Sequence, residues 1–268
     1  MGWPVAHSRS PIIHNHWIRE HQLSGAYGHF AVAPARLGEA IHGLRALGLA
    51  GCNITIPHKI EAMRFVDEVH PLAQRVGAIN CIVVQDNGRL VGYNHDGYGF
   101  MQSLLAAQSH WRADAGAAVV IGAGGACRAI LVSLIDAGVK EIRLINRTRS
   151  KAEALAQEFG PVIQALDWSD KEAALRDATL LVQTTNQGMH GEPALDLDLA
   201  ALPISALVAD IIYTPLETPL LAHARARGNA TVNGFGMLLH QARPAFASWF
   251  GVDPQVTPEL ERAVLATF

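Results

Sequence analysis

Cysteine is scarce in this chain, which carries only Cys52, Cys81 and Cys127 among its 268 residues. No two of them form a CxxC pair, and an odd number of cysteines cannot be paired completely into disulfides. Small secreted scaffolds depend on disulfides, whereas cytosolic proteins keep their thiols reduced. The cysteine pattern therefore argues against a disulfide-stapled fold and favours a cytoplasmic protein.

Long hydrophobic runs and strong net charge are also lacking. The apolar stretch 117–135 is interrupted by glycines and by Arg128, so we expect no membrane span. No basic segment followed by an apolar one opens the chain, so we expect no signal peptide. A net charge of -3 gives no reason to expect nucleic acid as a partner. The length suggests one or two domains, and a hydrophobic content of 50% can fill two cores.

Metal-binding patterns are missing as well, although the chain contains 13 histidines. Nothing matches HExxH or the Cys/His spacing of a zinc site. His14 and His16 are the closest pair, and residues two apart on a helix do not share a face. We therefore expect no metal site.

A glycine-rich turn is the clearest motif that is present. Residues 117–121 form an apolar, partly β-branched run, and a helical pattern covers 127–137. Between them lies the turn Gly122, Ala123, Gly124, Gly125 and Ala126. Glycines let the backbone approach a pyrophosphate, whose charge then sits at the positive end of the helix. Gly138 is placed to end that helix, and the strand 141–145 closes a βαβ unit of about thirty residues. Cys127 stands where GxGxxG has its third glycine, so the motif is incomplete.

The end of the second strand of this unit indicates which dinucleotide binds. An acidic residue there would accept the ribose hydroxyls of NAD, but the chain has Asn146, Arg147, Thr148 and Arg149 instead. Two guanidinium groups favour a 2′-phosphate, so we predict NADP as the cofactor. The alternative is that both arginines belong to a solvated turn.

The part of the chain before this unit is also of α/β type. A helix is predicted over 11–21, with Ile12, Ile13, His16 and Trp17 as its inner face. A second helix over 35–47 ends at Gly48, and 51–56 reads as a buried strand that runs into a loop. The pattern changes near 93–97 and again near 233–236, which are the candidate domain boundaries.

Several segments, in order along the chain, resemble motifs of the shikimate dehydrogenase family. The segment 53–59 is similar to the family's N-[VI]-T-[IV]-P-x-K motif, and 92–97 to its G-x-N-T-D-G segment. The turn at 122–126 resembles the family's own GAGGA variant, which accounts for the missing third glycine. Further matches lie at 2–11, 77–80, 146–148, 210–215 and 233–242. The resemblance covers nearly the whole chain.

The resemblance implies a role for individual residues. Ser8 and Ser10 would bind the substrate carboxylate, and Lys59 would lie beside the reacting oxygen. The remaining substrate contacts would be Thr55, Asn80, Asp96, Tyr213 and Gln241, and Gly234 would join the turn and the 146–149 segment in binding the cofactor.

Each assignment has a plainer structural alternative. Ser8 and Ser10 could cap the helix that Pro11 begins. Asn80 could be a turn residue, and Gln241 could face water from a helix. A lysine outside such a motif is most often solvated.

The chemistry implied is the reduction of a ketone. NADPH would deliver hydride to the C3 carbonyl carbon of 3-dehydroshikimate, and Lys59 would supply the proton to the oxygen. Asp96, within hydrogen-bond reach, would orient the ammonium group, so we predict Lys59 and Asp96 as the catalytic pair. The reaction belongs to chorismate and aromatic amino-acid biosynthesis.

The expected architecture is two α/β lobes with the active site in the cleft between them. Residues 1–94 with 235–268 would form the substrate-binding catalytic domain, and 95–234 a Rossmann-like NADP-binding domain. A homodimer is the assembly we consider. Two alternatives remain open: a quinate or aminoshikimate dehydrogenase of the same family, and a relative that senses the ligand without turnover.

Two features depart from the family pattern. His95 stands where the family usually has threonine, beside Asp96, so its charge could matter near pH 6.5. Family members usually have a short apolar strand before the substrate loop, and here Met1 lies almost at that loop. We expect either that the first sheet lacks a strand or that the natural protein begins several residues upstream.

Overall fold

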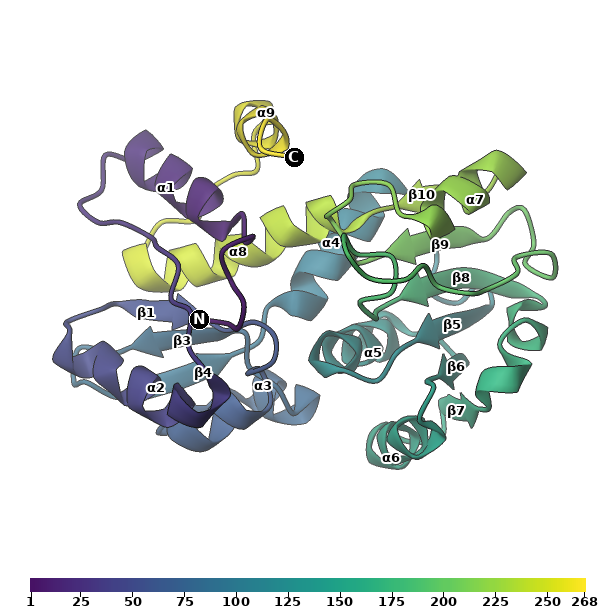
Figure 1. Ribbon diagram of the computed structural model, residues 1–268, viewed down its shortest axis with the longest axis horizontal. Coiled ribbons are helices and arrows are strands. Elements are labelled where there is room, and N and C mark those ends of the chain that lie inside the picture. The colour runs from purple at the N-terminus through teal and green to yellow at the C-terminus, as the bar shows by residue number, and fades with distance from the viewer. The chain divides into compact units, whose positions relative to one another are not determined.

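Two β-sheets organise the chain in the computed structural model, which describes residues 1–268 (Figure 1). Each sheet belongs to its own unit. The first unit comprises Met1–Asp96 and Leu239–Phe268, and the second comprises Gly97–Leu238. The chain leaves the first unit at the start of α4 (Asp96–Ala107) and returns to it within α8 (Gly234–Phe250).

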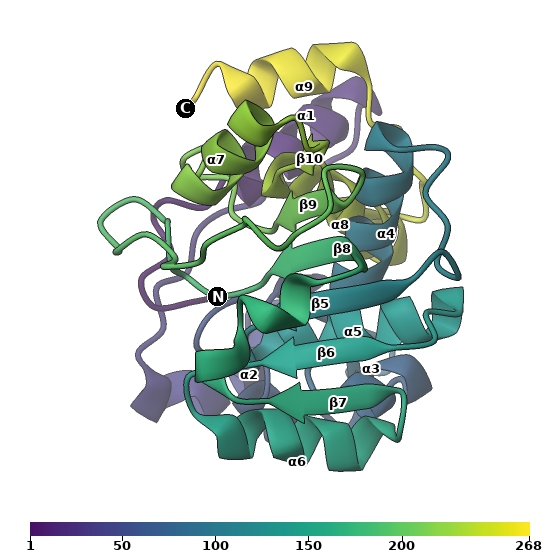
Figure 2. The same ribbon diagram turned by 90° about the vertical axis from the view of Figure 1, so that its right-hand side faces the viewer.

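The sheet of the second unit has six parallel strands in the order β10-β9-β8-β5-β6-β7 (Figure 2). Counted from β5, this is the order 3-2-1-4-5-6 of the doubly wound dinucleotide-binding fold. The prediction of a Rossmann-like unit is confirmed. Its elements are β5 (Ala117–Ile121), α5 (Gly125–Ala137), β6 (Ile142–Ile145), α6 (Arg149–Phe159), β7 (Ile163–Leu166), the 3-10 turns Trp168–Asp170 and Ala173–Leu175, β8 (Ala178–Gln183), β9 (Leu207–Asp210), α7 (Pro219–Arg227) and β10 (Thr231–Val232).

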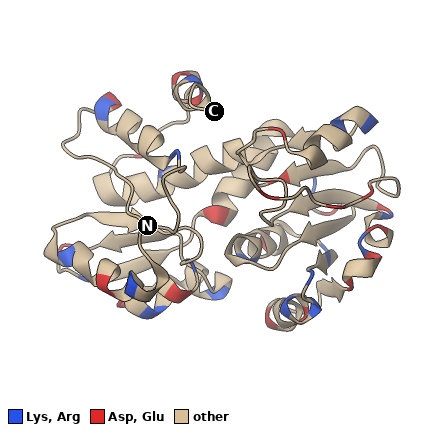
Figure 3. Cartoon of the chain, in the orientation of Figure 1, with Lys and Arg blue, Asp and Glu red and all other residues tan.

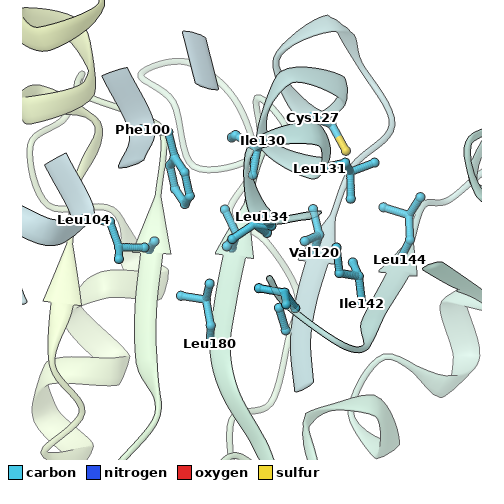
Figure 4. Packing of buried hydrophobic residues seen from close by; sticks show 14 of the residues in the cluster. Phe100, Leu104, Val120, Cys127, Ile130, Leu131, Leu134, Ile142, Leu144 and Leu180 are labelled. Carbon is cyan, nitrogen blue, oxygen red and sulfur yellow. The ribbon is translucent and has the colours of Figure 1, made fainter. Parts of the chain in front are cut away.

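Apolar clusters cover both faces of this sheet, which is why the central strand reads as an unbroken apolar run. All five residues of β5 are buried. Val120 packs with Ile130 and Leu134 of α5 on one face (Figure 4), whereas Val119 belongs to the cluster on the other face. The helix α5 ends at Gly138, whose φ of 96° is left-handed, so this predicted stop is confirmed. The buried strand thereby carries the glycine-rich turn on a rigid support.

The sheet of the first unit is mixed and has four strands in the order β1-β3-β4-β2. The pairs β1·β3 and β3·β4 are antiparallel, and β2·β4 is parallel. The elements of this unit are α1 (Ser10–Glu20), a 3-10 turn (Pro34–Arg36), α2 (Leu37–Ala46), β1 (Gly51–Asn53), a 3-10 turn (Glu61–Phe65), β2 (Glu68–Val69), α3 (Pro71–Val76), β3 (Cys81–Val84), β4 (Leu90–Tyr93) and α9 (Pro258–Leu265).

The first residues of the chain lie between two segments of this unit. Gly2 forms an isolated parallel bridge with Ala31, and the Trp3 N–H donates to Ile56 O at 3.1 Å. On the same side, the Thr55 N–H donates to Met1 O at 3.0 Å. This segment therefore makes ladder-type hydrogen bonds with both neighbours but forms no strand of its own.

The inner face of α1 differs from the prediction. The buried residues are Ile13, His14, Trp17 and Ile18, so the helix is rotated relative to the expected face, and Ile12 is not among them. Helical spacing alone fits either face, and only the structure shows that His14 and Ile18 are buried in place of Ile12 and His16. In the structure the His14 ring stacks on Tyr27, with centroids 4.3 Å apart.

Burial of His14 makes the stability of the protein sensitive to acid. Burial lowers the pKa of His14 to about 3, and the nearby Asn53 side chain offsets only part of this shift. The unfolded chain binds a proton at His14 at a higher pH than the folded protein does. The contribution of the neutral His14 ring to the unfolding free energy is therefore intact above pH 6.5 and is lost as the pH falls toward 3. Between pH 6.5 and 5, His14 should lower the unfolding free energy of the wild-type protein by about 2 kcal/mol. His14→Phe should not show this decrease.

The measurement is urea unfolding of both proteins across this pH range. His16→Phe, on the partly exposed side of the same helix, is the control and should keep the wild-type dependence. Parallel pH curves for wild type and His14→Phe would contradict the assignment.

Charged residues of both signs lie on each of the two units. Figure 3 shows Lys and Arg interspersed with Asp and Glu along the helices and loops of both units. None of the helices combines the length and the apolar character needed to cross a membrane.

Candidate active site

Lys59 and Asp96 form an ion pair in the first unit, although they are 37 positions apart in the chain. The Lys59 Nζ donates to Asp96 Oδ2, and the two side chains are 15% and 5% exposed. Little water reaches the pair, so its electrostatic interaction is stronger than that of a surface salt bridge. The structure thus brings the two predicted catalytic residues together.

Backbone contacts fix the position of Lys59. The Ile79 N–H donates to Lys59 O at 2.8 Å, and the His58 N–H donates to Thr55 O at 2.9 Å. The buried His58 ring is held by Val32 O at 2.8 Å. The lysine therefore projects from a turn whose backbone is anchored on both sides.

Asp96 is held at the first turn of α4. Its N–H donates to Asn94 Oδ1 at 3.0 Å, and Asn94 Nδ2 donates to Ala78 O at 2.9 Å. A carboxylate at a helix N-terminus is stabilised by the helix dipole. Sequence reasoning gave Asn94 no role, although the Asn-x-Asp pattern before a helix is a recognisable capping signal.

Asn80 links Asp96 to a third predicted site residue. Its Nδ2 donates to Asp96 Oδ1 at 2.8 Å and to Gln241 Oε1 at 3.2 Å, while its Oδ1 accepts from the His95 N–H at 2.9 Å. Asn80 is 2% exposed, so its amide group depends on these protein partners rather than on water for its hydrogen bonds. Asn80 is therefore more than a turn residue, and Gln241 faces this cluster rather than solvent alone.

Asn53 is a second residue to which sequence reasoning gave no role. Its Nδ2 donates to Asn80 O at 3.0 Å, and the Tyr27 hydroxyl donates to Asn53 Oδ1 at 2.7 Å. The pattern offered no signal for this bridge, because Tyr27 is far from Asn53 in sequence.

The His95 side chain is neutral near neutral pH. Burial lowers its pKa to about 4, and the nearby Asp96 carboxylate only partly counteracts this. The ring stacks on Tyr93, with centroids 6.0 Å apart. The expectation of a charge change near pH 6.5 is therefore wrong, because this histidine is partly buried in the folded protein.

Ser8, Ser10 and Thr55 offer hydroxyl groups in the same unit. Ser8 Oγ lies 3.2 Å from Ser10 Oγ and accepts from the Ser10 N–H at 3.3 Å. Arg9 is the N-cap residue of α1 and its own side chain makes no capping bond. Ser8 therefore bonds the first N–H of the helix, as the capping alternative supposes, while its hydroxyl lies next to that of Ser10. The Thr55 hydroxyl makes no hydrogen bond within the protein, so it is available to a ligand.

The glycine-rich turn of the second unit leaves a helix N-terminus open. Gly124 is the N-cap of α5 and makes no side-chain capping bond. A Cβ on Gly124 would meet no atom within 4 Å, whereas one on Gly122 would lie 2.4 Å from Thr184 Oγ1. Gly122 is needed for packing, and Gly124 leaves free space above the helix end. This free space and the unpaired N–H groups of the first turn suit a phosphate.

The two arginines after β6 differ in their surroundings. Arg149 pairs with Glu153 at 2.7 Å and with Asp167. The exposed Arg147 makes no hydrogen bond or ion pair. Asn146 Nδ2 donates to Thr148 O at 2.9 Å, which shapes the turn. Arg147 is therefore the free cation of the two, and a ligand would have to compete for Arg149.

The two remaining predicted residues, Tyr213 and Gly234, belong to the second unit. Tyr213 follows β9 in the second unit, where the Asp210 carboxylate accepts from the Ile212 N–H at 3.0 Å and from the Thr218 hydroxyl at 2.8 Å. Gly234 opens α8, and a Cβ there would lie 2.0 Å from Ile211 O. Close packing alone therefore accounts for a glycine at 234.

Family models match both units of the chain. The model described as the shikimate dehydrogenase substrate binding domain matches residues 1–82, and the one described as shikimate / quinate 5-dehydrogenase matches residues 105–190.

Individual relatives match over nearly the full length. Shikimate dehydrogenase (NADP(+)) of Rhodospirillum rubrum is 52% identical over 269 residues, which cover 99% of this chain and 95% of the relative. The structure of shikimate 5-dehydrogenase from Thermus thermophilus in complex with NADP(H) and shikimate has a TM-score of 0.88 at 35% identity, covering 100% of this chain and 97% of that one. Quinate dehydrogenase from Corynebacterium glutamicum in complex with NAD has a TM-score of 0.90 at 29% identity, covering 99% and 96%.

Proposed function

Because the chain belongs to the shikimate dehydrogenase family, we propose that it is an NADP-dependent oxidoreductase that interconverts 3-dehydroshikimate and shikimate. The observation that carries this proposal is the little-exposed Lys59–Asp96 pair. Asn80 donates to Asp96 and also to Gln241, so Gln241 is linked to the pair through Asn80. A cation held beside several polar groups is suited to a substrate that carries one reacting oxygen and several hydroxyls.

The cluster accounts for the proton that the reaction needs. When bound, NADPH supplies a hydride to the carbonyl carbon of the substrate. The Lys59 ammonium donates a proton to the oxygen on which negative charge develops. Asp96 fixes the direction of that ammonium group through Oδ2, and Asn80 holds the carboxylate in place through Oδ1. In the reverse direction Lys59 takes the proton back from the hydroxyl.

The other predicted substrate contacts follow from the groups that are available. We assign Ser8 and Ser10 to the substrate carboxylate, since their hydroxyls are adjacent. The free Thr55 hydroxyl, Asn80 and Gln241 are assigned to the ring hydroxyls, and Tyr213 remains a proposed substrate contact. Apart from Asp96 and Tyr213, these contacts lie in residues 1–94 with 235–268, to which we assign substrate binding, and we assign NADP binding to 95–234.

The residues around the glycine-rich turn fit NADP. The open helix end at Gly124, Gly125 and Ala126 would hold the pyrophosphate, and Gly122 and Ala123 shape the approach. Arg147 would pair with the 2′-phosphate, with Asn146 and Thr148 forming the turn that presents it.

Two alanine substitutions in this turn should affect different properties: Gly122→Ala the stability of the fold, and Gly124→Ala the binding of NADP. Gly122→Ala should lower the stability by about 1–3 kcal/mol, because the new Cβ would overlap Thr184 and φ is 116°. Gly124→Ala should leave the stability unchanged, since nothing lies within 4 Å. It should weaken NADP binding about tenfold or more, because the methyl group would displace a charged phosphate from its hydrogen bonds.

Thermal unfolding without ligand and an NADP titration separate the two effects. If Gly124→Ala binds NADP as wild type does, the pyrophosphate does not lie against this residue.

An initial-rate assay tests the proposed function directly. The protein is supplied with shikimate or quinate, each with NADP or NAD, and we expect the highest kcat/KM for shikimate with NADP. A higher value for quinate would favour the quinate dehydrogenase activity named for the Corynebacterium glutamicum structure. Binding of dehydroshikimate without turnover of any pair would identify a ligand-sensing relative and overturn the proposal.

We further propose a cytoplasmic location, because all three cysteines are free and buried. A homodimer is the first assembly to test, by sedimentation at several protein concentrations.

A further inference from the structure

The loop that carries Ser8 and Ser10 has an arginine between the two serines. Arg9 is the N-cap residue of α1, and both the Ile12 and the Ile13 N–H groups donate to Arg9 O, at 3.0 and 3.3 Å. The conformation of Arg9 therefore sets the positions of the two adjacent serines.

The guanidinium of Arg9 is held by the far end of the chain. Nη2 donates to Thr267 O at 2.7 Å, Nη1 donates to His7 O at 3.1 Å, and the group lies 5.3 Å above the centre of the Phe268 ring. We call the contact of Arg9 with Thr267 and Phe268 the Arg9 latch. A charged donor on a carbonyl oxygen and a cation over an aromatic ring are both stronger than their neutral counterparts.

The helix before Thr267 is itself firmly anchored. α9 lies beside α1 in both views (Figures 1 and 2), and its Leu260 and Val264 are fully buried. The Trp17 indole of α1 donates to Gln255 O at 3.0 Å, and the Thr267 hydroxyl donates to Val264 O at 2.7 Å. The acceptor for Arg9 thus directly follows a helix that is packed onto the first unit through Leu260 and Val264.

The same C-terminal segment is also tied to the helix that carries Gln241. Arg243 of α8 donates to Pro254 O at 2.7 Å and pairs with Asp253 at 3.0 Å. Residues 253–268 therefore connect the Gln241 helix with the serine loop, two parts of the first unit that we assign to substrate binding.

We propose that Arg9 is a positioning residue, and that its latch onto Thr267 and Phe268 holds Ser8 and Ser10 ready for the substrate carboxylate. This inference rests on the proposed function of the two serines. A loop that is ordered only part of the time binds its ligand more weakly by that fraction, so loosening the latch raises KM. Once substrate is bound, the loop is ordered again, and the chemical step is unaffected.

Loss of the guanidinium should affect the loop more than the fold. The Arg9 Nε is buried without a hydrogen-bond partner, so its removal relieves one unpaired donor while it breaks the latch. His29 still holds Ser8 O at 2.9 Å from another side, so the loop is loosened rather than released.

The test compares Arg9→Met and Phe268→Ala with matched controls. Arg262→Met removes an exposed arginine from α9, and Leu265→Ala truncates a side chain that is 41% exposed, as Phe268 is. Arg9→Met should raise KM for shikimate on the order of tenfold, with kcat and KM for NADP unchanged. Phe268→Ala should show a smaller change of the same kind, and both controls should match wild type. Arg9→Lys, which retains the cation, should recover part of the affinity.

Hydrogen exchange provides a readout that does not depend on activity. The amides of Ile12 and Ile13 should exchange faster in Arg9→Met than in Arg262→Met, with equal thermal midpoints. Unchanged exchange and unchanged KM for shikimate would overturn the proposal, as would equal rises in both KM values. If the wild-type protein turns over no shikimate, the proposed function fails. Faster exchange of the Ile12 and Ile13 amides in Arg9→Met would still establish the Arg9 latch in that case.

Discussion

Lys59→Ala is expected to lose about 10²–10⁴-fold in kcat, because a positioned acid contributes this much to proton transfer. The residue lies on a turn and not in an apolar cluster, so the fold should persist. Stopped-flow or initial-rate measurements with shikimate and NADP would give the loss, and circular dichroism would verify the fold. Lys171→Ala is a suitable control: Lys171 is 13% exposed and pairs with Glu172 at 2.7 Å, yet it has no proposed role.

Asp96→Ala should lose a similar amount, because Lys59 and Asp96 act as one unit. The double mutant should therefore lose much less than the sum of the two single losses in ΔΔG‡. Full additivity would show that the two residues act independently. Since removal of one partner leaves a poorly solvated charge, the stability of each single mutant must be measured alongside.

Arg147→Ala should produce the second large effect, on the choice of cofactor. A charge-assisted hydrogen bond is worth about 1.5–3 kcal/mol, so losing the pairing with the 2′-phosphate should reduce the NADP preference over NAD by about 10–150-fold in kcat/KM. Arg149→Ala should have a smaller effect, because Glu153 and Asp167 already hold its guanidinium. An unchanged NADP:NAD ratio in Arg147→Ala would remove this residue from the cofactor site.

The contrast between these arginines shows where sequence reasoning was limited. Arg147 and Arg149 looked equivalent, since both follow a predicted strand in a segment typical of phosphate binding. Only the folded chain places Asp167, 18 positions away, against Arg149. Likewise, only the folded chain shows that the Ile211 carbonyl leaves no room for a Cβ at Gly234, whose role in cofactor binding stays a prediction.

Local sequence was sufficient where one short segment fixes the physics. The apolar strand 117–121, the turn 122–126 and the stop at Gly138 could be predicted, because glycine alone tolerates the left-handed φ of 96° at 138 and the close packing at Gly122. The inner face of α1 was mispredicted, because burial of His14 depends on aromatic partners from distant segments.

By itself the sequence determined the parallel doubly wound sheet and the position of the dinucleotide turn, since strand, glycine turn and helix follow one another within a short segment. It also named Lys59 and Asp96 through family resemblance. Tertiary structure alone decided that Asn80 joins Asp96 to Gln241, that His95 is neutral, and that Arg9 is held by Thr267 and Phe268. Hydrogen bonds and burial depend on which distant segments meet, and no local pattern encodes that meeting.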